Sequence, residues 1–532
     1  MDKLLRITID GRSCEVPQGI TVAAALAHAG SGITRHSVDA TPRAPFCGMG
    51  ICQECRVTVD GRAHNLACQT LCGQGMIIST AAASAPLAGA IAAGSQRSAS
   101  LYFDVLIIGA GPAGLAAAQI AAGGGEHVGV IDDNPQAGGQ IWRHGPKAPA
   151  PKKAQALLQS LSHMSNVSLM HNTRVVQQLA PDCLLLEGLQ HSCVVRFRRL
   201  ILATGARERL LPFPGWTLPG VTGAGGLQAL IKGGMPVAGQ RIVIAGSGPL
   251  LFAAAATAQA HGATVVAIIE QSPPAALARF LASLCYTPGK LAQAAWLRFG
   301  LRGTPYLLDS HVISASGQAN LEQIQVRHGT RQITLACDRL ACGYGLLPNL
   351  RMAQALQCAQ DGPAIRVDAL QRTSLPNVFA AGECTGIGGM ELSFIEGQIA
   401  AYAALGNEPA ARALFKQRAK WQRFAARLAE HFSLSSALRN LPDADTLICR
   451  CEDISYAAVT AHSDWRNAKL HTRCGMGPCQ GQICGTAAGF CLGWPDPAIR
   501  APFTPSRIGT LMQTCDTLAA APEQSNDGVM SC

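Results

Sequence analysis

The sequence is poor in charge and has no long apolar run. Charged residues make up 14% of the 532 residues, and the net charge of +10 is spread along the chain without a block of like charges. Such a dispersed charge favours solubility and attraction to an acidic partner, and we expect no nucleic-acid binding. Outside the segments expected for a buried nucleotide-binding core, no apolar stretch approaches the ~18 residues of a membrane span. We therefore expect no transmembrane helix.

We also expect no secretory leader. Residues 1–16 alternate like a β-strand and lack the basic start and apolar centre of a signal peptide. The chain nevertheless contains 21 cysteines. In a protein that stays in the cytoplasm, so many cysteines indicate metal or redox sites and not disulfides. We expect a cytoplasmic protein that carries such sites.

One stretch, residues 103–133, organises the rest of the chain. A buried strand over 105–108 runs into a glycine-rich turn, an alanine-rich helix follows, and a second apolar strand ends at Asp132 or Asp133. In this strand–turn–helix pattern the glycines allow a tight turn beside a pyrophosphate at the helix N-terminus, and Asp132 would accept a ribose hydroxyl. The motif predicts a dinucleotide site that contains Gly109, Gly111, Pro112, Ala113 and Gly114.

Three later segments complete this first unit. A glycine loop with Gly139 and Gln140 would lie against a flavin, and a buried strand ends in the turn Thr204-Gly205, which is common where two-dinucleotide flavoproteins cross between domains. The strand that ends at Gly382-Glu383 resembles the second flavin fingerprint of the pyridine-nucleotide oxidoreductases. That family usually has Asp where Glu383 stands, so contact with the ribityl chain is an open question.

A second strand–turn–helix begins at residue 241. Its turn contains Gly246 and Gly248, and its companion strand ends at Glu270, which would favour NAD over NADP because a carboxylate repels a 2′-phosphate. The third glycine position is Leu251, which changes the contact between helix and strand. This unit either binds a nucleotide or is a scaffold that keeps only the fold. The order of the motifs implies that it is inserted into the first unit.

Four cysteines near the N-terminus have the spacing of an iron–sulfur site. The first three follow the plant-type C-x4-C-x2-C pattern, and the fourth returns after twelve residues. The segment resembles the N-terminal iron–sulfur domain of the succinate dehydrogenase type, although zinc is an alternative metal for these ligands. The predicted 2Fe–2S ligands are Cys47, Cys52, Cys55 and Cys68.

A second cysteine group lies near the C-terminus. The pattern is C-x-C, then 22 residues, then C-x4-C. It resembles the bacterioferritin-associated ferredoxin-like 2Fe–2S domain, and zinc is again the alternative metal. Cys484, Cys491, Cys515 and Cys532 receive no role. The predicted ligands are Cys449, Cys451, Cys474 and Cys479.

Other features limit the chemistry. Disulfide reductases of this fold have a cysteine pair that faces the flavin, and no such pair occurs in residues 103–222, so we do not expect disulfide reduction. Cys337 and Cys342 have suitable spacing but flank a late strand of the inserted unit. The histidines are isolated and form no acid–base group, so no catalytic residue is predicted. Residues 408–440 predict an amphipathic connecting helix, or alternatively a basic helix at a membrane surface.

Taken together, the motifs GAGPAG, AGSGPLL, AAGECTGIGG, CEDI and CGMGPCQG resemble the large subunits of bacterial multi-subunit amino-acid and opine dehydrogenases, the group of hydrogen cyanide synthase, octopine and nopaline oxidases and D-hydroxyproline dehydrogenase. The resemblance implies an α/β fold: a two-dinucleotide-binding (Rossmann-type) flavoprotein core, an N-terminal α+β ferredoxin-like domain and a small C-terminal helical iron–sulfur domain. The predicted domains are 1–83 (ferredoxin-like), 84–100 (linker), 101–405 (flavoprotein, with about 223–345 inserted), 406–440 (connector), 441–500 (second iron–sulfur domain) and 501–532 (tail).

The resemblance also implies a division of labour. The substrate would be oxidised on an FAD-bearing amine-oxidase-type beta subunit, with FMN between the subunits. This chain would hold FAD, or NAD or another adenine nucleotide, together with two 2Fe–2S clusters. It would pass electrons outward to an acceptor such as the respiratory chain or a quinone. The competing hypothesis is a self-contained NADH-dependent ferredoxin-type reductase with Glu270 holding NADH; a redox sensor is less favoured, since no DNA-binding segment is present.

Overall fold

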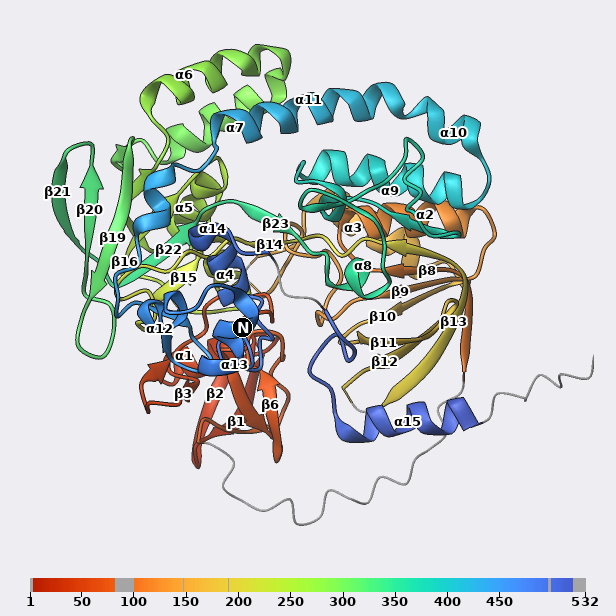
Figure 1. The fold of residues 1–532 in the computed structure, drawn as a ribbon, viewed down its shortest axis with the longest axis horizontal. Coiled ribbons are helices and arrows are strands. Elements are labelled where there is room, and N and C mark those ends of the chain that lie inside the picture. Colours follow the sequence, from red (N-terminus) through yellow and green to blue (C-terminus); the bar gives the residue numbers. More distant parts are fainter. Residues whose placement is uncertain (1–2, 82–99, 147, 190, 496–498, 520–532) are drawn as a thin grey trace, which may run out of the picture.

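The protein is described here from a computed structural model of residues 3–81, 100–146, 148–189, 191–495 and 499–519. Most of the predicted linker, 84–100, lies outside these residues. Figure 1 shows two α/β units side by side, with the N-terminal domain below them and helices above. The mixed α/β class predicted from the sequence is confirmed. No helix in the described ranges is long and apolar enough to cross a membrane.

The N-terminal domain is a five-stranded sheet with one helix against it. Leu5, Ile7 and Ile9 of its first strand are buried, whereas the residues between them are more exposed, as in a strand with one covered face. The helix begins after Thr21, whose hydroxyl caps it by accepting the Ala24 N–H at 3.3 Å. Its elements are β1 (Leu4–Ile9), β2 (Arg12–Pro17), α1 (Val22–His28), β3 (Arg35–His36), β4 (Pro42–Arg43), β5 (Arg56–Val59), β6 (Arg62–Leu66) and β7 (Ile77–Ser79), with sheet order β2-β1-β7-β5-β6.

The first nucleotide-binding unit is built on a sheet whose order is β10-β9-β8-β13-β12-β11, with β26 beside β13. Its central strands are parallel and covered on both faces, which is why β9 is buried along its whole length. The chain leaves this sheet after β13 and returns at β26, so the intervening residues form an insertion. The elements are β8 (Leu101–Ile108), α2 (Pro112–Gly123), β9 (Val128–Ile131), α3 (Lys152–Ser162), β10 (Val167–Met170), β11 (Arg174–Ala180), β12 (Cys183–Glu187), β13 (Ser192–Leu202), β26 (Val378–Ala380) and α9 (Met390–Ala404).

The inserted second unit has a parallel sheet of order β15-β22-β16-β17-β18 and a three-stranded antiparallel sheet, β19-β20-β21. The antiparallel pair β14–β23 joins the two units. The elements are β14 (Ala206–Glu208), β15 (Val221–Gly223), α4 (Ala224–Lys232), β16 (Arg241–Gly246), α5 (Leu250–Ala260), β17 (Thr264–Glu270), α6 (Pro274–Ser283), η1 (Leu284–Tyr286), α7 (Pro288–Gly300), β18 (Tyr306–Leu307), β19 (Ser310–Ser316), β20 (Gln323–His328), β21 (Arg331–Ala336), β22 (Arg339–Gly343) and β23 (Leu346–Pro348).

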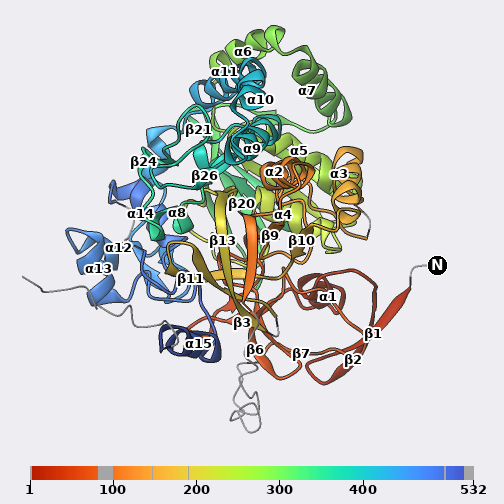
Figure 2. The ribbon, with the colours of Figure 1, turned by 90° about the vertical axis from the view of Figure 1, so that its right-hand side faces the viewer.

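The rest of the chain links and covers these units. The single connecting helix predicted over 408–440 is instead divided into α10, α11 and η3; α11 ends at His431 because the next residues turn onto the second unit. Figure 2 shows α6, α7 and α11 at the end of the molecule opposite the N-terminal sheet. The remaining elements are α8 (Arg351–Ala355), β24 (Gln360–Asp361), β25 (Ala364–Ile365), η2 (Glu383–Thr385), α10 (Glu408–Ala413), α11 (Phe415–His431), η3 (Ser436–Asn440), β27 (Leu447–Cys449), β28 (Ile454–Ser455), α12 (Tyr456–Thr460), α13 (Trp465–Thr472), α14 (Cys484–Leu492) and α15 (Ile508–Ala519).

One hydrophobic core joins three parts of the molecule. Phe46 and Met49 from the N-terminal cysteine loop, Ile448 from the C-terminal domain, and Val243 and Ile269 from the second unit belong to the same buried cluster. The N-terminal and C-terminal cysteine segments are therefore packed on one another and on the inserted unit. Apolar burial of this kind is the main contribution that holds such parts together.

Candidate functional site

The glycine turn of the first unit has little room for any side chain. Gly109 has a φ of +110°, and a Cβ there would lie 2.2 Å from the Ala203 carbonyl oxygen. A Cβ at Gly114 would lie 1.8 Å from the Gly109 carbonyl oxygen, so α2 packs directly on the turn. Gly111 differs, because a Cβ there would come no closer than 4.0 Å to its nearest neighbour, the Gly139 Cα, and the residue stays half-buried. Pro112 starts α2, whose N–H groups therefore face this gap.

Asp132 braces this turn from the end of β9. Its Oδ2 accepts the Ala110 N–H at 2.6 Å, and its Oδ1 accepts the Asn134 N–H and side-chain amide at 2.8 Å each. The carboxylate thus fixes the turn as well as standing where a ribose hydroxyl would be bound. Because a buried carboxylate needs partners, these bonds also explain how Asp132 tolerates 7% exposure.

The other predicted residues of the first unit gather around the same turn. A Cβ at Gly139 would lie 3.0 Å from the Gly111 Cα, and a Cβ at Gly382 would lie 2.8 Å from the Ala113 Cβ. Thr204 follows β13 beside Gly109 and donates its hydroxyl to Asn349 O at 2.8 Å, and Gly205 has a φ of +67°. Glu383 begins η2, and burial raises its pKa. Gln140 is exposed.

The second unit repeats the skeleton of the first. A Cβ at Gly246 would lie 2.0 Å from the Gly343 carbonyl oxygen. Glu270 is fully buried; its Oε2 accepts the Gly248 N–H at 2.7 Å and its Oε1 accepts the Ser272 N–H at 2.9 Å. The predicted acid is therefore bonded to the turn, as Asp132 is. Leu251 is buried in the core between α5 and the sheet.

A segment of the chain covers this second turn. Ser247 donates its hydroxyl to Phe432 O at 3.2 Å, and the side chain of Phe432 lies 3.6 Å from where a Gly248 Cβ would be. Gln271 holds the next residues, since its amide donates to Ser433 O at 3.0 Å and its carbonyl accepts the Ser435 N–H at 3.0 Å. Residues 432–435, the covering segment, thus occupy the mouth of the turn where a pyrophosphate would lie.

The N-terminal cysteines form two pairs. The Cys52 N–H lies against the Cys47 Sγ, and the Cys68 N–H lies 3.5 Å from the Cys55 Sγ, so Cys47 neighbours Cys52 and Cys55 neighbours Cys68. Backbone N–H groups also point at sulfur: those of Met49 and Cys52 lie 3.4 Å from the Cys47 Sγ. The hydrogen bond with Cys52 lowers the pKa of Cys47 to about 6 against the opposing effect of burial. All four thiols are buried, and burial together with Cys47 raises the pKa of Cys52, while Cys55 and burial raise that of Cys68, so within this loop it is Cys47 that is stabilised as a thiolate.

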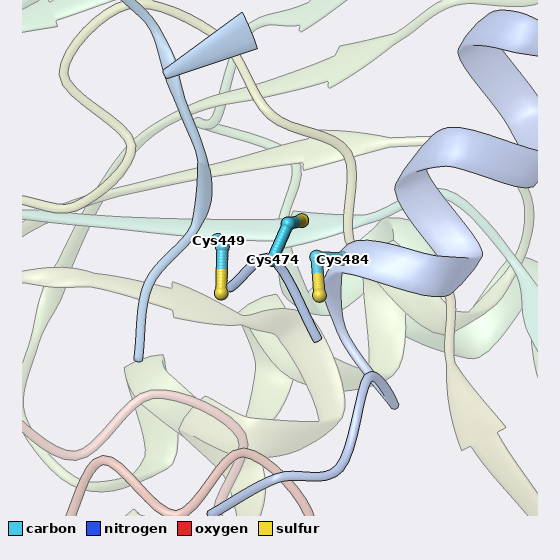
Figure 3. A group of neighbouring side chains, drawn as sticks. All are labelled: Cys449, Cys474 and Cys484. Atoms are coloured by element: carbon cyan, nitrogen blue, oxygen red, sulfur yellow. The ribbon is translucent and has the colours of Figure 1, made fainter. Parts of the chain in front are cut away.

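The C-terminal cysteines include one that the sequence prediction omitted. The sulfur atoms of Cys449, Cys474 and Cys484 lie within 4.8 Å of one another, and come from the end of β27, the loop after α13 and the start of α14 (Figure 3). Cys451 is hydrogen-bonded to Cys479, which also contacts Cys484. Five thiols therefore meet here. Cys479 and Cys484 have the same C-x4-C spacing as Cys474 and Cys479, a signal that could have identified Cys484.

The N-terminal cysteine loop lies between the first dinucleotide site and the C-terminal cysteines. Arg143 donates to Gly48 O at 2.7 Å and to the Asn134 side-chain oxygen at 2.8 Å, and Gln69 donates to the same oxygen at 3.3 Å. Asn134 is the residue that Asp132 binds. On its other side the loop packs on the C-terminal domain.

An arginine-lined cavity lies between the joined units and the C-terminal domain. Its volume is about 280 Å³, and it is lined by Arg207, Arg209 and Arg439 with Thr486 and Phe490 among others, without a carboxylate. A neighbouring hollow shares Arg207 and adds Arg351 and Gln482. The side chain of Arg207 donates to the Thr486 hydroxyl at 3.1 Å, and Thr486 lies two residues beyond Cys484. The guanidinium groups that line this cavity can bind an anionic group.

The fold and these sites define a class: an oxidoreductase with two units of the dinucleotide-binding (Rossmann) fold and cysteine sites at both ends. Residues 103–404 match the pyridine nucleotide-disulphide oxidoreductase family, and residues 2–83 match the 2Fe-2S iron-sulfur cluster binding domain. Hydrogen cyanide synthase subunit HcnB of Pseudomonas protegens is 32% identical over 74% of this chain and 91% of its own length. An opine oxidase subunit from Rhizobium meliloti is 31% identical over 72% of this chain and 90% of its own.

The chain therefore belongs to the pyridine nucleotide-disulphide oxidoreductase family, in the group that includes HcnB and this subunit of opine oxidase, and it carries a 2Fe–2S domain at its N-terminus. The resemblance inferred from the motifs is confirmed. Among solved structures, L-proline dehydrogenase from P. horikoshii superposes with a TM-score of 0.67 over 96% of this chain and 98% of its own, at 17% identity, a likeness of fold.

Proposed function

We propose that this protein is the electron-transfer flavoprotein and iron–sulfur subunit of a heteromeric dehydrogenase for an amino acid, imino acid, hydroxyproline or opine, and that a partner FAD subunit oxidises the substrate. The main support is the contrast between the two glycine turns: the first leaves Gly111 half-buried, whereas residues 432–435 cover the second. Electrons therefore enter from a partner and not from NADH. Two relatives are named as subunits, of hydrogen cyanide synthase and of opine oxidase, which agrees with a multi-subunit enzyme.

FAD fits the first unit. The gap at Gly111, the α2 N-terminus and the Asp132 carboxylate would hold its pyrophosphate and ribose, and Gly139, Thr204-Gly205 and Gly382-Glu383 would border the flavin half. The bound flavin supplies two-electron chemistry, and iron–sulfur clusters carry single electrons. The protein's own contribution is to position these groups and tune their potentials.

The cysteine pairs favour 2Fe–2S clusters over zinc at the N-terminal site. In a 2Fe–2S cluster each iron takes two cysteines, whereas one zinc ion gathers all four ligands around a single centre. Cys47 with Cys52, and Cys55 with Cys68, which are neighbours through backbone N–H contacts to sulfur, would each bind one iron. At the C-terminal site Cys449, Cys451, Cys479 and one of Cys474 and Cys484 would bind a second cluster.

FMN at the subunit interface would use the arginine-lined cavity. Its phosphate is a dianion, and guanidinium groups bind phosphate through paired hydrogen bonds. Arg209 and Arg439 each lie over the Phe490 ring, at 5.5 and 5.7 Å from its centre, so the ring holds both guanidinium groups at the cavity. From here an electron has a short route to the C-terminal cysteines, because Thr486 lines the cavity beside Cys484.

The competing function is a self-contained NADH-dependent ferredoxin-type reductase. Glu270 supports it, since an acid in this position would bind the NADH ribose. Against it, the covering segment fills the mouth of the turn and Glu270 has no exposed surface, whereas Asp132 of the first unit keeps 7% exposure beside a half-buried Gly111.

An anaerobic titration separates the two functions. NADH is added stoichiometrically to the purified flavin-loaded chain while the visible spectrum is recorded. We expect no change until an amino- or imino-acid substrate is supplied together with a co-expressed amine-oxidase-type subunit, after which the flavin and cluster bands bleach. Rapid bleaching by NADH alone would refute the proposed division of labour and favour the reductase.

Membrane association, with a respiratory-chain or quinone acceptor, is a further part of the proposal. Residues 273–305 contain no acidic residue, and α7 has no buried side chain; it exposes Trp296 (73%) and Phe299 (67%) among Lys and Arg. A basic helix with exposed aromatics suits the surface of an anionic bilayer. We expect binding to phosphatidylglycerol vesicles but not to phosphatidylcholine vesicles, and loss of binding in W296S/F299S. Unchanged binding in that variant, with Tyr102→Ser as control, would contradict this surface.

A further inference from the structure

Two buried ion pairs join the N-terminal and C-terminal cysteine loops. Glu54, between Cys52 and Cys55, accepts the Arg450 Nε–H at 2.8 Å; Arg450 lies between Cys449 and Cys451. The exposed fractions of these two side chains are 0% and 3%. The second pair, Arg43 with Asp453, is buried to the same degree. Each member of the first pair is thus flanked by cysteines of its own site.

Arg450 is held in one orientation. Its Nη1 donates to Trp216 O at 2.7 Å, and its guanidinium lies 4.0 Å from the centre of the Phe46 ring and 4.9 Å from that of Trp216. Arg35 supports the other side, since its Nη2 donates to the second Glu54 oxygen at 2.8 Å and to Arg450 O at 3.3 Å. The pair cannot swing out to solvent without breaking this network.

Stability alone does not account for such an arrangement. A buried ion pair loses hydration of both charges, and apolar side chains of similar volume often hold two surfaces together as well. The apolar core that already joins the loops shows that such packing is available at this junction. Charges beside an iron–sulfur cluster, in contrast, change its reduction potential, because reduction adds a negative charge.

We infer that electrons pass directly between the two cysteine sites, and that the Glu54–Arg450 pair sets the difference between the reduction potentials of the two clusters. The inference rests on the proposed function, in which both sites hold clusters. Arg450 stabilises the extra electron at the C-terminal site, and Glu54 disfavours it at the N-terminal site. One electron passes between the sites with no bond made or broken, and the pair favours its residence at the C-terminal site.

The test is an EPR-monitored redox titration of the full chain with both clusters. In Arg450→Gln, we expect the reduced-to-oxidised ratio of the C-terminal cluster at a fixed ambient potential to fall at least tenfold, which is about 59 mV for a one-electron couple. In Glu54→Gln, the ratio for the N-terminal cluster should rise by a similar factor. Arg450→Lys keeps the charge but loses the planar stacking, and should leave the potentials close to those of the wild type.

Controls separate this role from a purely structural one. Arg241→Gln removes half of the exposed Arg241–Asp338 pair, whose side chains are 48% and 41% exposed, and should change neither potential. If Arg450→Gln fails to load its cluster, Glu54→Gln still tests the inference at the other site. Unchanged potentials in the loaded single variants would overturn it. Wild-type protein with iron at only one site would refute the cluster assignment itself, before any variant is compared.

Discussion

The two nucleotide-binding units share a skeleton but differ in what their turns face. In both, a glycine without room for a Cβ starts the turn, and a carboxylate from the next strand bonds to its backbone. In the first unit Gly109 and Gly111 remain half-buried, whereas Gly246 and Gly248 of the second are buried and Phe432 lies against Gly248. The glycine motif therefore specifies a backbone shape, and the segments packed outside it decide whether that shape can bind a nucleotide.

The largest loss of stability should come from substituting the first glycine of each turn, a position that the two units share. Gly109→Ala and Gly246→Ala each place a Cβ about as close as 2 Å to a carbonyl oxygen, at a positive φ. We expect both to lower the unfolding free energy by several kcal/mol, more than the ~1 kcal/mol of strain in Gly345→Ala, where nothing lies within 4 Å. Urea denaturation measures the difference. Tolerance of either variant would show that its turn is not rigid.

Glu396, a buried glutamate in α9 of the first unit, should make the stability of the protein depend on pH. Burial raises the pKa of Glu396 to about 7 from an ordinary 4.5, against hydrogen bonds from the Gly382 N–H and Thr385. The folded state holds the proton more tightly, so stability is full below pH ~4.5 and falls by about 3 kcal/mol as pH rises through 7. In denaturation from pH 5 to 8, Glu396→Gln should remove this contribution, while the fall that comes from Glu208, whose pKa burial also raises to about 7, remains.

Its control is the exposed Glu430 on α11, where Glu430→Gln should reproduce the wild-type pH profile. A profile in Glu396→Gln as steep as that of the wild type would assign the pH dependence to another group.

The sequence predicted the parts of this comparison that depend on neighbours along the chain. Strand ends, glycine turns and acids at fixed offsets follow from local geometry, and these elements stand where the motifs placed them. The cover on the second unit joins residues 185 positions apart, and the Glu54–Arg450 pair spans 396 positions. No local pattern encodes such contacts. Cys484 is different, because its spacing from Cys479 is a local pattern that is visible in the sequence.

The second glycine of each turn, Gly111 in the first unit and Gly248 in the second, distinguishes nucleotide binding from backbone stability. Gly111 has a φ of −77° and free space beside it, so Gly111→Ala should leave stability unchanged but weaken FAD binding at least tenfold, because the methyl group would occupy the pyrophosphate position. Gly248 has a φ of +91°, so Gly248→Ala should cost about 1 kcal/mol of stability and leave FAD content unaffected. Flavin content after dialysis and urea midpoints report the two quantities. The reverse pattern would exchange the roles assigned to the two units.

The weakest nucleotide binding is expected when the covered site is opened. Phe432 packs on Phe280 with ring centres 4.9 Å apart as well as lying against Gly248, so Phe432→Ala should cost about 1–2 kcal/mol. It should also leave a turn that binds an adenine nucleotide weakly, in the millimolar range, because the N–H groups at the start of α5 become accessible. Calorimetric titration with NADH compares the variant with the wild type, which should show no binding at this site. Micromolar binding by the wild type would mean that residues 432–435 do not close the site, and that the second unit is a working nucleotide site like the first.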